Sequence, residues 1–562
     1  MKAKPLFLAA ILPLLLLHVA TTVAQSLPIH AIPPKHEVRA VWLTTIGGID
    51  WPHSYSAASQ RRELSQILDQ LKLANVNTVL VQTRIRATTI YPSTLEPWDG
   101  CLSGTPGRSP GYDALQLVID ECHRRGMECH AWVVTMPVGK WNKLGCQQLR
   151  RHHPQLVRRL GDEGYMDPSN PGTASYLAQL CAEVTRNYDI DGIHLDYIRY
   201  PEAWPKARRT TEHDARRRHI TAIVTAIHHA VKVIKPWVKL SCSPVGKATE
   251  LSRYRSGGWN AYHAVSQDAQ GWLRQGLMDQ LYPMQYFRGN QFFPFALDWQ
   301  ERSYGRTIIS GLGIYFLSPS EGNWPIGEVK RQLHFARDNR LGHAYFRSKF
   351  LTDNTKGIYN FIRDFDHSPA LIPPMTWAWS QPPTAPTHLS LTRTDKADRL
   401  SWDGATDHSR APYLLYNIYA STTPDVDTSD PRCLVATRLM ATTATLPHSP
   451  GATLHYAVTA LDRYGNESQP CLTSSQAKDM APHHQLLLTD GKRLNLPPKG
   501  NILDAAYVAI VTLQGQVVAT LPYRDRQADI SRLDEGVYEL RSIGRKGISH
   551  RLGFFAVKRG TH

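Results

Sequence analysis

Strand-like and helix-like segments alternate over the first 350 residues, and this order is the strongest constraint on the fold. Eight short apolar runs have the composition of buried strands: 37–45, 78–84, 128–134, 190–196, 238–243, 279–286, 307–314 and 342–347. Amphipathic stretches with helical spacing lie between several of them: 61–73, 112–125, 174–188, 220–234 and 267–276. This alternation predicts an α/β protein with a (β/α)₈ TIM-like barrel over residues 37–375. A doubly wound open sheet is the alternative, although no G-x-G-x-x-G follows the first run.

The composition changes after the barrel region. A Pro-rich segment at 381–386 is followed by short alternating runs bounded by turn residues, which predicts an all-β sandwich over residues 384–475. Trp402, Tyr416 and the turn at 462–467 give this region a resemblance to fibronectin type III modules. Short β-type runs in residues 483–562 predict a further small β domain, which resembles the C-terminal sorting domains of type IX secretion. The expected architecture is therefore a barrel followed by C-terminal all-β sandwich domains.

The N-terminus has the composition of a secretory signal peptide. Lys2 and Lys4 precede an apolar run from Leu6 to Ala20, and small residues follow up to Ala24. We therefore expect residues 1–24 to be removed and the protein to be exported to the periplasm, to the cell surface or into the medium. No later apolar run is long enough to span a bilayer, so no transmembrane segment is expected in the mature chain.

The net charge of +16 favours an acidic partner such as an anionic glycan or surface. No nucleic-acid motif accompanies the scattered basic residues, so nucleic acid is not an expected partner. None of the eight cysteines forms a C-x-x-C pair, and no spaced set of metal ligands or G-x-S-x-G motif is present. We therefore predict no metal site and no cofactor.

A single stretch, residues 188–201, carries the clearest functional signal. A short apolar run passes through Gly192 and ends in polar and aromatic side chains, with Asp196 at the exit of the predicted strand. Burying a carboxylate is costly unless it is used, and parallel barrels place catalytic groups at the carboxyl ends of strands. Asp196 is therefore the first candidate for a catalytic carboxylate. The alternative is a structural Asp that holds Arg199 or caps the next helix.

Other polar and aromatic residues at predicted strand ends or on loops are candidates for binding sugar hydroxyls and sugar rings. They are His130, His194, Tyr197, Arg199, Gln285, Tyr286, Arg347 and Trp98. His194 lies two residues before Asp196 and therefore on the same strand face. It is equally consistent with an interior layer of the barrel.

Several motifs give residues 37–377 a resemblance to the glycoside-hydrolase-like family 10 barrel, formerly a domain of unknown function. They include 39–44, 91–98, 125–132, 166–168, 191–201 and 283–286. The resemblance implies a glycosidase fold with Asp196 as the nucleophile. Many members carry a Pro and an acidic residue just after the second strand, whereas this chain has Arg84-Ile-Arg-Ala-Thr-Thr89, so no role there carries over.

Glycoside hydrolysis requires a second carboxylate as proton donor or base. Glu96 and Asp268 are the leading candidates, with Glu321 and Asp353 after them, because all four are expected in loops near strand ends. Asp268 is equally well placed to cap a helix. The expected function is an exported glycoside hydrolase acting on a complex glycan, with the bacterial cell-wall glycan, peptidoglycan, favoured. The alternative is a carbohydrate-binding or surface-scaffold protein whose barrel has lost activity.

Overall fold

The computed structural model describes residues 32–254, 256, 258–394, 397–447, 453–473, 489, 492–496, 505–512, 517–523, 527–544 and 549–557. The predicted signal peptide, residues 1–24, lies outside the described residues. The chain divides into two compact units, one reaching to Ser380 with Ser429–Arg438 added, the other comprising Gln381–Thr428 and the residues from Leu439 onward.

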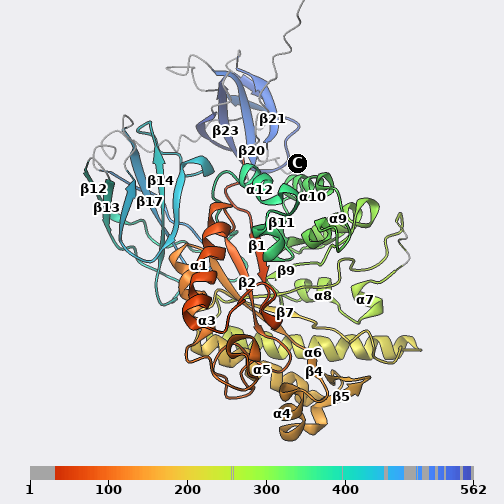
Figure 1. The fold of residues 1–562 in the computed structure, drawn as a ribbon. Helices are drawn as coiled ribbons and strands as arrows, with labels where there is room; N and C mark the ends of the chain where they lie inside the picture. The colour runs from red at the N-terminus through yellow and green to blue at the C-terminus, as the bar shows by residue number, and fades with distance from the viewer. Residues whose placement is uncertain are drawn as a thin grey trace, which may run out of the picture. The chain divides into compact units, whose positions relative to one another are not determined.

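Eight parallel strands close into a barrel in the first unit (Figure 1). Their order around the barrel is β1-β11-β10-β9-β8-β7-β3-β2. The strands are β1 (Arg39–Leu43), β2 (Thr78–Arg84), β3 (Glu128–Val134), β7 (Gly192–Asp196), β8 (Lys239–Cys242), β9 (Gln280–Leu281), β10 (Thr307–Leu312) and β11 (Gly342–Tyr345). Each falls within one of the eight predicted runs, so the predicted TIM-like barrel is confirmed.

Helices surround the barrel: α1 (Ala57–Leu73), α3 (Ala114–Arg124), α5 (Pro171–Asn187), α6 (Thr210–Ile234), α8 (Ala269–Arg274), α9 (Phe293–Glu301), α10 (Ile326–Asp338) and α12 (Ile358–Phe365). Helix α6 begins ten residues before its predicted start, and its added first part carries the basic cluster at 216–218. Between β3 and α5 the chain forms a separate three-stranded sheet of β4 (Pro137–Lys140), β6 (Glu163–Met166) and β5 (Val157–Leu160), in that order. No pattern in the sequence predicted this insertion.

Strand residues alternate between two apolar cores. Val41, Ile193 and Leu195 belong to the larger cluster between the strands and the helices. Trp42, Trp132 and Tyr282 belong to a second cluster that fills the barrel interior. Because side chains alternate along a strand, His194 and Asp196 also face the interior.

A buried ionic cluster lies at the N-terminal ends of β1 and β11. Asp366, just after α12, makes ion pairs with Arg39 at 3.3 Å and with Arg337 at 2.5 Å, and its Oδ2 lies 3.3 Å from His343 Nε2. Glu37 binds both arginines, at 2.8 and 2.7 Å. Glu37, His343 and Asp366 are close enough to hold a metal ion. The two guanidinium groups already supply positive charge to both carboxylates, so these residues do not fit a divalent cation.

Replacing Asp366 by Asn should destabilise the protein by about 3–5 kcal/mol at pH 7, because it leaves buried arginines without their carboxylate. Burial alone would raise the pKa of Asp366, but Arg39, His343 and Arg337 lower it to about 2. The Asp366 carboxylate therefore makes its full contribution to the free energy of unfolding above the unfolded-state pKa, near 3.9. This contribution is lost as the pH falls toward the folded-state pKa of about 2. Denaturant unfolding at pH 7 and pH 3 measures both effects.

Asp353→Asn is the matched control, because Asp353 pairs with Lys349 while both side chains are about half exposed. Such a pair contributes at most about 1 kcal/mol. Equal stability of the two variants at pH 7 would contradict the role given to the buried cluster.

The C-terminal part consists of antiparallel sheets. One has three strands, β12 (Thr387–Arg393), β13 (Ala397–Asp403) and β16 (Thr443–Pro447); another has four, β15 (Leu434–Leu439), β14 (Leu415–Ser421), β17 (His455–Leu461) and β18 (Cys471–Leu472). Further along, β21 (Val517–Pro522), β20 (Ala505–Thr512), β23 (Gly536–Gly544) and β24 (Ser549–Val557) form a four-stranded sheet in that order. Strand β19 (Arg493–Asn495) pairs with β22 (Gln527–Asp529). The predicted all-β character of this region is confirmed, and the fibronectin resemblance stays a prediction. Within the described residues, no helix has the length and apolarity needed to cross a membrane.

Candidate active site

Asp196 is the last residue of β7 and lies at the C-terminal end of the barrel, called the mouth below. Its neighbours come from the strands on either side of β7, because the barrel order places β3 and β8 there. Trp132 is on β3 and Ser243 directly follows β8. Strand order therefore brings together three residues that lie far apart in the sequence.

Three hydrogen bonds fix the Asp196 carboxylate. Oδ1 accepts from Ser243 Oγ at 2.8 Å and from the Tyr197 backbone N–H at 2.8 Å. Oδ2 accepts from Trp132 Nε1 at 3.1 Å. Among the described residues Oδ2 thus receives a single donor, and it keeps acceptor capacity for a substrate atom. This is the arrangement expected of an oriented nucleophile or general base.

The Asp196 side chain is buried, with 7% of the residue exposed. Burial raises the pKa of Asp196, while the Arg199 charge and the hydrogen bonds from Ser243, Tyr197 and Trp132 oppose that rise. Each donor therefore stabilises the charged form of the carboxylate.

Tyr197 and Arg199 continue the mouth beyond Asp196. Tyr197 is 36% exposed and has a φ of +53°, a left-handed conformation that costs a bulky residue about 1–3 kcal/mol. The Arg199 guanidinium lies over the Tyr197 ring at 4.3 Å and over Trp259 at 5.4 Å, and it pairs with Glu202 at 2.6 Å. Strained backbone and exposed aromatic rings beside a buried carboxylate are typical of a binding site.

Tyr286 belongs to an aromatic cluster at the same end. It stacks on Phe346 with ring centroids 5.5 Å apart and meets Tyr315 edge-to-face at 5.7 Å. Burial and then the charge of Asp196 raise the pKa of Tyr286, so its hydroxyl remains protonated near Asp196. Tyr286 therefore keeps its O–H as a hydrogen-bond donor at the end of the barrel where Asp196 lies.

The two histidines lie deeper in the barrel. His194 Nε2 accepts from Trp42 Nε1 at 3.2 Å and its Nδ1 lies 3.0 Å from Ser241 Oγ. Burial, then the charge of His130, lowers the pKa of His194, so it is neutral. His130 pairs in register with Gly192, four residues before Asp196, and bonds Glu128 at 3.0 Å. Both are fully buried interior residues. For His194 this favours the interior-layer alternative, and the sugar contact stays a prediction for both residues.

The two leading proton-donor candidates have structural partners. Glu96 is bound by Arg84 through both Nε, at 2.8 Å, and Nη2, at 2.6 Å, and it accepts from Tyr176 at 3.1 Å. Asp268 is the N-cap of α8 and accepts from Gly271 N–H at 3.1 Å. Within the described part of the chain, neither has a hydrogen bond with Asp196.

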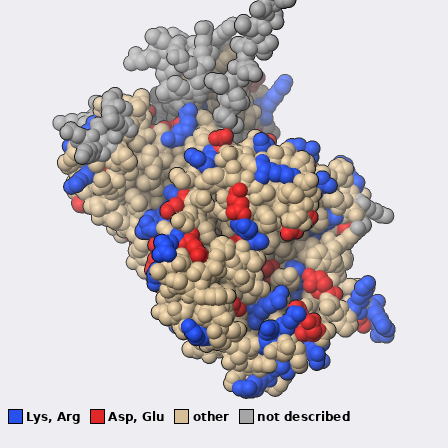
Figure 2. All heavy atoms as spheres, in the orientation of Figure 1, with Lys and Arg blue, Asp and Glu red and all other residues tan. Residues whose placement is uncertain are grey.

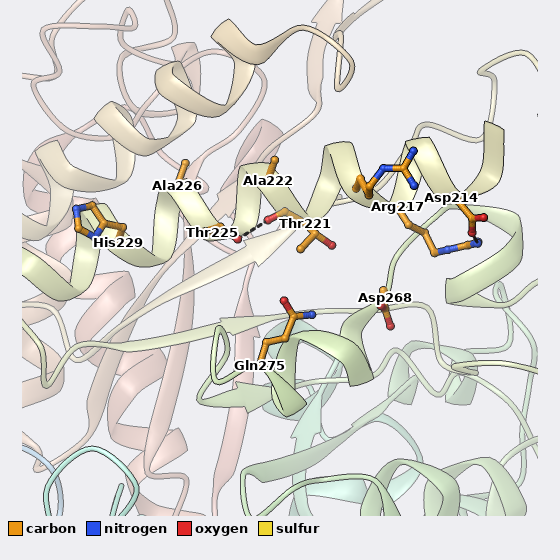
Figure 3. A pocket seen from close by; sticks show the side chains of 10 residues that line it. Asp214, Arg217, Thr221, Ala222, Thr225, Ala226, His229, Asp268 and Gln275 are labelled. Atoms are coloured by element: carbon orange, nitrogen blue, oxygen red, sulfur yellow. Dashed lines mark hydrogen bonds and ion pairs between the residues drawn. The ribbon is translucent and has the colours of Figure 1, made fainter. Parts of the chain in front are cut away.

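Asp268 also lines a groove of about 760 Å³ in the outer helical layer, between α8 and α6. Figure 3 shows Asp268 and Gln275 on the α8 side, across from Thr221 and Thr225 of α6. The groove lies between helices and includes none of the residues around Asp196. Its position favours the helix-capping interpretation of Asp268.

The remaining predicted residues contact groups other than the Asp196 carboxylate. Gln285 accepts from Ser310 at 2.8 Å and is buried, and Trp98 packs against the outer core. Arg347 is at the mouth, where it pairs with Asp50. Burial raises the pKa of Asp50 although the Arg347 charge opposes it.

Sequence reasoning missed Trp132, Ser243 and Asp50. Ser243 is the last residue of a predicted strand, and Trp132 lies two residues after His130 on the same face of its strand. Position at a strand end and the alternation of side chains along a strand could therefore have marked both residues. Asp50 follows the first strand by several residues and had no pattern to mark it.

A closed parallel barrel with a buried, oriented carboxylate at the C-terminal ends of its strands defines the class of TIM-barrel proteins whose site lies at that end. The chain belongs to the glycosyl hydrolase-like 10 family, whose model matches residues 37–315. It is 28% identical over 474 residues to the glycosyl hydrolase YngK of Bacillus subtilis, covering 77% of this chain and 92% of that protein.

A second relative is the glycosyl hydrolase DigH of Escherichia coli strain K12, 30% identical over 410 residues, covering 62% of this chain and 93% of that protein. Among solved structures, the catalytic domain of the β-amylase from Paenibacillus polymyxa matches with a TM-score of 0.41 and 10% identity. That match covers 60% of this chain and 99% of the other.

The hydrogen bond from Ser243 leads to a prediction about pH dependence. Because Ser243 stabilises the charged form of Asp196, Ser243→Ala should raise the pKa of Asp196. The acidic limb of the kcat/KM profile should then move toward higher pH by roughly one unit, the value of one charge-assisted hydrogen bond.

Ser310→Ala is the matched control, because Ser310 is also a buried serine but donates to Gln285. Its acidic limb should stay where the wild-type limb is. An unmoved limb in Ser243→Ala would show that Asp196 is not the group titrating there.

Proposed function

We propose that this protein is an exported glycoside hydrolase that cleaves a complex glycan, with the bacterial cell-wall glycan, peptidoglycan, as the favoured substrate. The observation that carries the proposal is the Asp196 carboxylate, which three donors hold in place while Oδ2 keeps acceptor capacity. The relatives named glycosyl hydrolases support the reaction type. The N-terminal sequence pattern and the basic charge support export and an anionic target.

In the proposed reaction, Asp196 Oδ2 attacks the anomeric carbon while the bond to the leaving oxygen breaks and a second carboxyl group protonates that oxygen. Water then cleaves the glycosyl ester and returns a proton to the second carboxylate. Tyr197 and Trp259 would stack on sugar rings, since both are exposed aromatic residues beside Asp196 and Arg199.

A non-catalytic carbohydrate-binding protein is the second candidate. It is favoured by one observation: Glu96 and Asp268, the leading proton-donor candidates, are held in structural contacts. In that case the aromatic residues at the mouth would bind the glycan without cleaving it.

A panel of defined glycans separates the two candidates. The full chain is incubated with peptidoglycan, chitin oligosaccharides and neutral plant glycans, and the products are identified by mass spectrometry. Asp196→Asn serves as the blank. New reducing ends that require Asp196 support the hydrolase, whereas saturable binding without any product supports the binding protein.

A further inference from the structure

The insertion between β3 and α5 presents an unusually basic surface. It contains β4 (Pro137–Lys140), α4 (Leu144–His152), β5 (Val157–Leu160) and β6 (Glu163–Met166). Residues 138–161 include six lysines and arginines and no Asp or Glu, although the whole chain has 48 acidic residues against 64 basic ones. We call these six the basic surface: Lys140, Lys143, Arg150, Arg151, Arg158 and Arg159. Figure 2 shows Lys and Arg gathered at the end of the molecule where α4 and β5 lie.

Most of these charges have no carboxylate nearby. Lys140 lies 3.4 Å from Asp162, and Arg158 lies 2.7 Å from Asp167. The other four make no ion pair with any described residue. An excess of positive charge on one element attracts anions, so an anionic ligand that neutralises these side chains would be bound favourably.

Packing holds part of the surface in place. The Arg150 guanidinium lies 3.8 Å from the Trp141 ring centre and donates to the Trp141 carbonyl at 2.9 Å. Arg159 lies over the same ring at 5.4 Å. Two guanidinium groups are thus ordered before any ligand arrives, which lowers the entropy lost on binding.

The insertion is joined directly to the candidate site. It starts after Thr135, whose N–H and Oγ both donate to the Asp196 carbonyl, at 2.9 and 2.8 Å. On β6, Tyr165 lies close enough to Tyr197 and Glu202 for their charges to act on it. The basic surface therefore lies on an element that borders the mouth.

The chemistry of the surface favours one kind of partner. Residues 137–166 include no large exposed apolar side chain among those described, so nothing there would insert into a bilayer. Arginine covers the Trp141 ring, which is therefore not a free platform for nucleic-acid bases. A polysaccharide with repeating anionic groups would fit best, because the basic surface presents several cations on the insertion that borders the mouth.

We propose that the basic surface binds the charged groups of an anionic polysaccharide while a neighbouring part of the same chain occupies the mouth. This inference rests on the proposed function, because it assigns the mouth to a glycan. It adds a second contact region, which would make the protein select long acidic chains over neutral ones.

The test uses the full chain carrying Asp196→Asn, so that binding is measured without turnover. The probes are polygalacturonate and a neutral dextran of similar length, titrated at 50 and 200 mM NaCl. We expect polygalacturonate to bind more tightly than dextran, with weaker binding at the higher salt. Lys143→Gln, Arg151→Gln and Arg159→Gln together should weaken polygalacturonate binding at least tenfold.

A control triple variant removes the same charge elsewhere: Arg61→Gln, Arg62→Gln and Arg274→Gln, all exposed on α1 or α8. It should change the affinity less than threefold. An equal loss in both triple variants, or no preference over dextran, would overturn the proposal. Equally tight, equally variant-sensitive binding of a 20-base DNA strand would identify a general phosphate surface and also overturn it. If polygalacturonate binding behaves as expected but the wild type cleaves no glycan, the proposed hydrolase fails and the basic surface stands.

Discussion

Replacing Asp196 by Asn is expected to lower kcat/KM on the natural glycan by about 10³-fold or more, a loss of roughly 4 kcal/mol of transition-state stabilisation. The amide is a poor nucleophile, and its NH₂ group would face Trp132 Nε1, which is itself a donor. Steady-state kinetics on a substrate found in the glycan panel measures the loss.

Folding should not suffer from this substitution. Burial raises the pKa of Asp196, which means that the folded state pays a cost for the charged carboxylate at neutral pH. A neutral side chain removes that cost and offsets the poorer contact with Trp132, so the melting temperature should stay nearly unchanged. Turnover close to the wild-type rate would rule out Asp196 as the essential group.

The same position also reports the stereochemical course. If Asp196 forms a glycosyl ester, azide added to Asp196→Ala should restore cleavage of an activated aryl glycoside and give a glycosyl azide of inverted configuration. The configuration of the wild-type product separates this case from the other: a glycosyl ester leads to retention, whereas an Asp196 that activates water leads to inversion. Either product analysis decides between nucleophile and base.

Replacing Glu321 by Gln is expected to have the second-largest effect, because we expect Glu321 to be the proton donor. It is exposed in the loop after β10, and its charge acts on Tyr315. Tyr315 meets Tyr286 edge-to-face, and Tyr286 is close enough to Asp196 to respond to its charge. A bound glycan would cover Glu321 and exclude water from it, as the site of a general acid requires.

Glu321→Gln should therefore slow cleavage of natural glycans by about 10²–10⁴-fold and spare aryl glycosides whose leaving groups need no protonation. Glu96→Gln and Asp268→Asn are the controls. They should reduce stability, through the lost Arg84 pair and the lost helix cap, without this dependence on the leaving group. If one of the two controls depends on the leaving group and Glu321→Gln does not, the residue replaced in that control, Glu96 or Asp268, is the proton donor.

Local sequence patterns were sufficient to predict the barrel and to select Asp196 as the first catalytic candidate. A strand that is buried on both faces needs a continuous apolar run, and the residue at its exit is marked by the change to polar side chains, so both the eight strands and Asp196 were visible in the sequence. The dual interpretation of Asp268 was visible too, because capping depends on residues only three positions apart.

Only the tertiary structure decided which side chains meet. Trp132 and Ser243 reach Asp196 because β3 and β8 flank β7 around the barrel. The order of the strands around a barrel cannot be predicted from a short stretch of sequence. The depth of His130 depends on the register between β3 and β7, and the pairing of Glu96 with Arg84 depends on how a long loop returns to its strand. These contacts are set by long-range packing, so composition and periodicity determined the fold and the leading carboxylate, while the barrel's closure determined that carboxylate's partners.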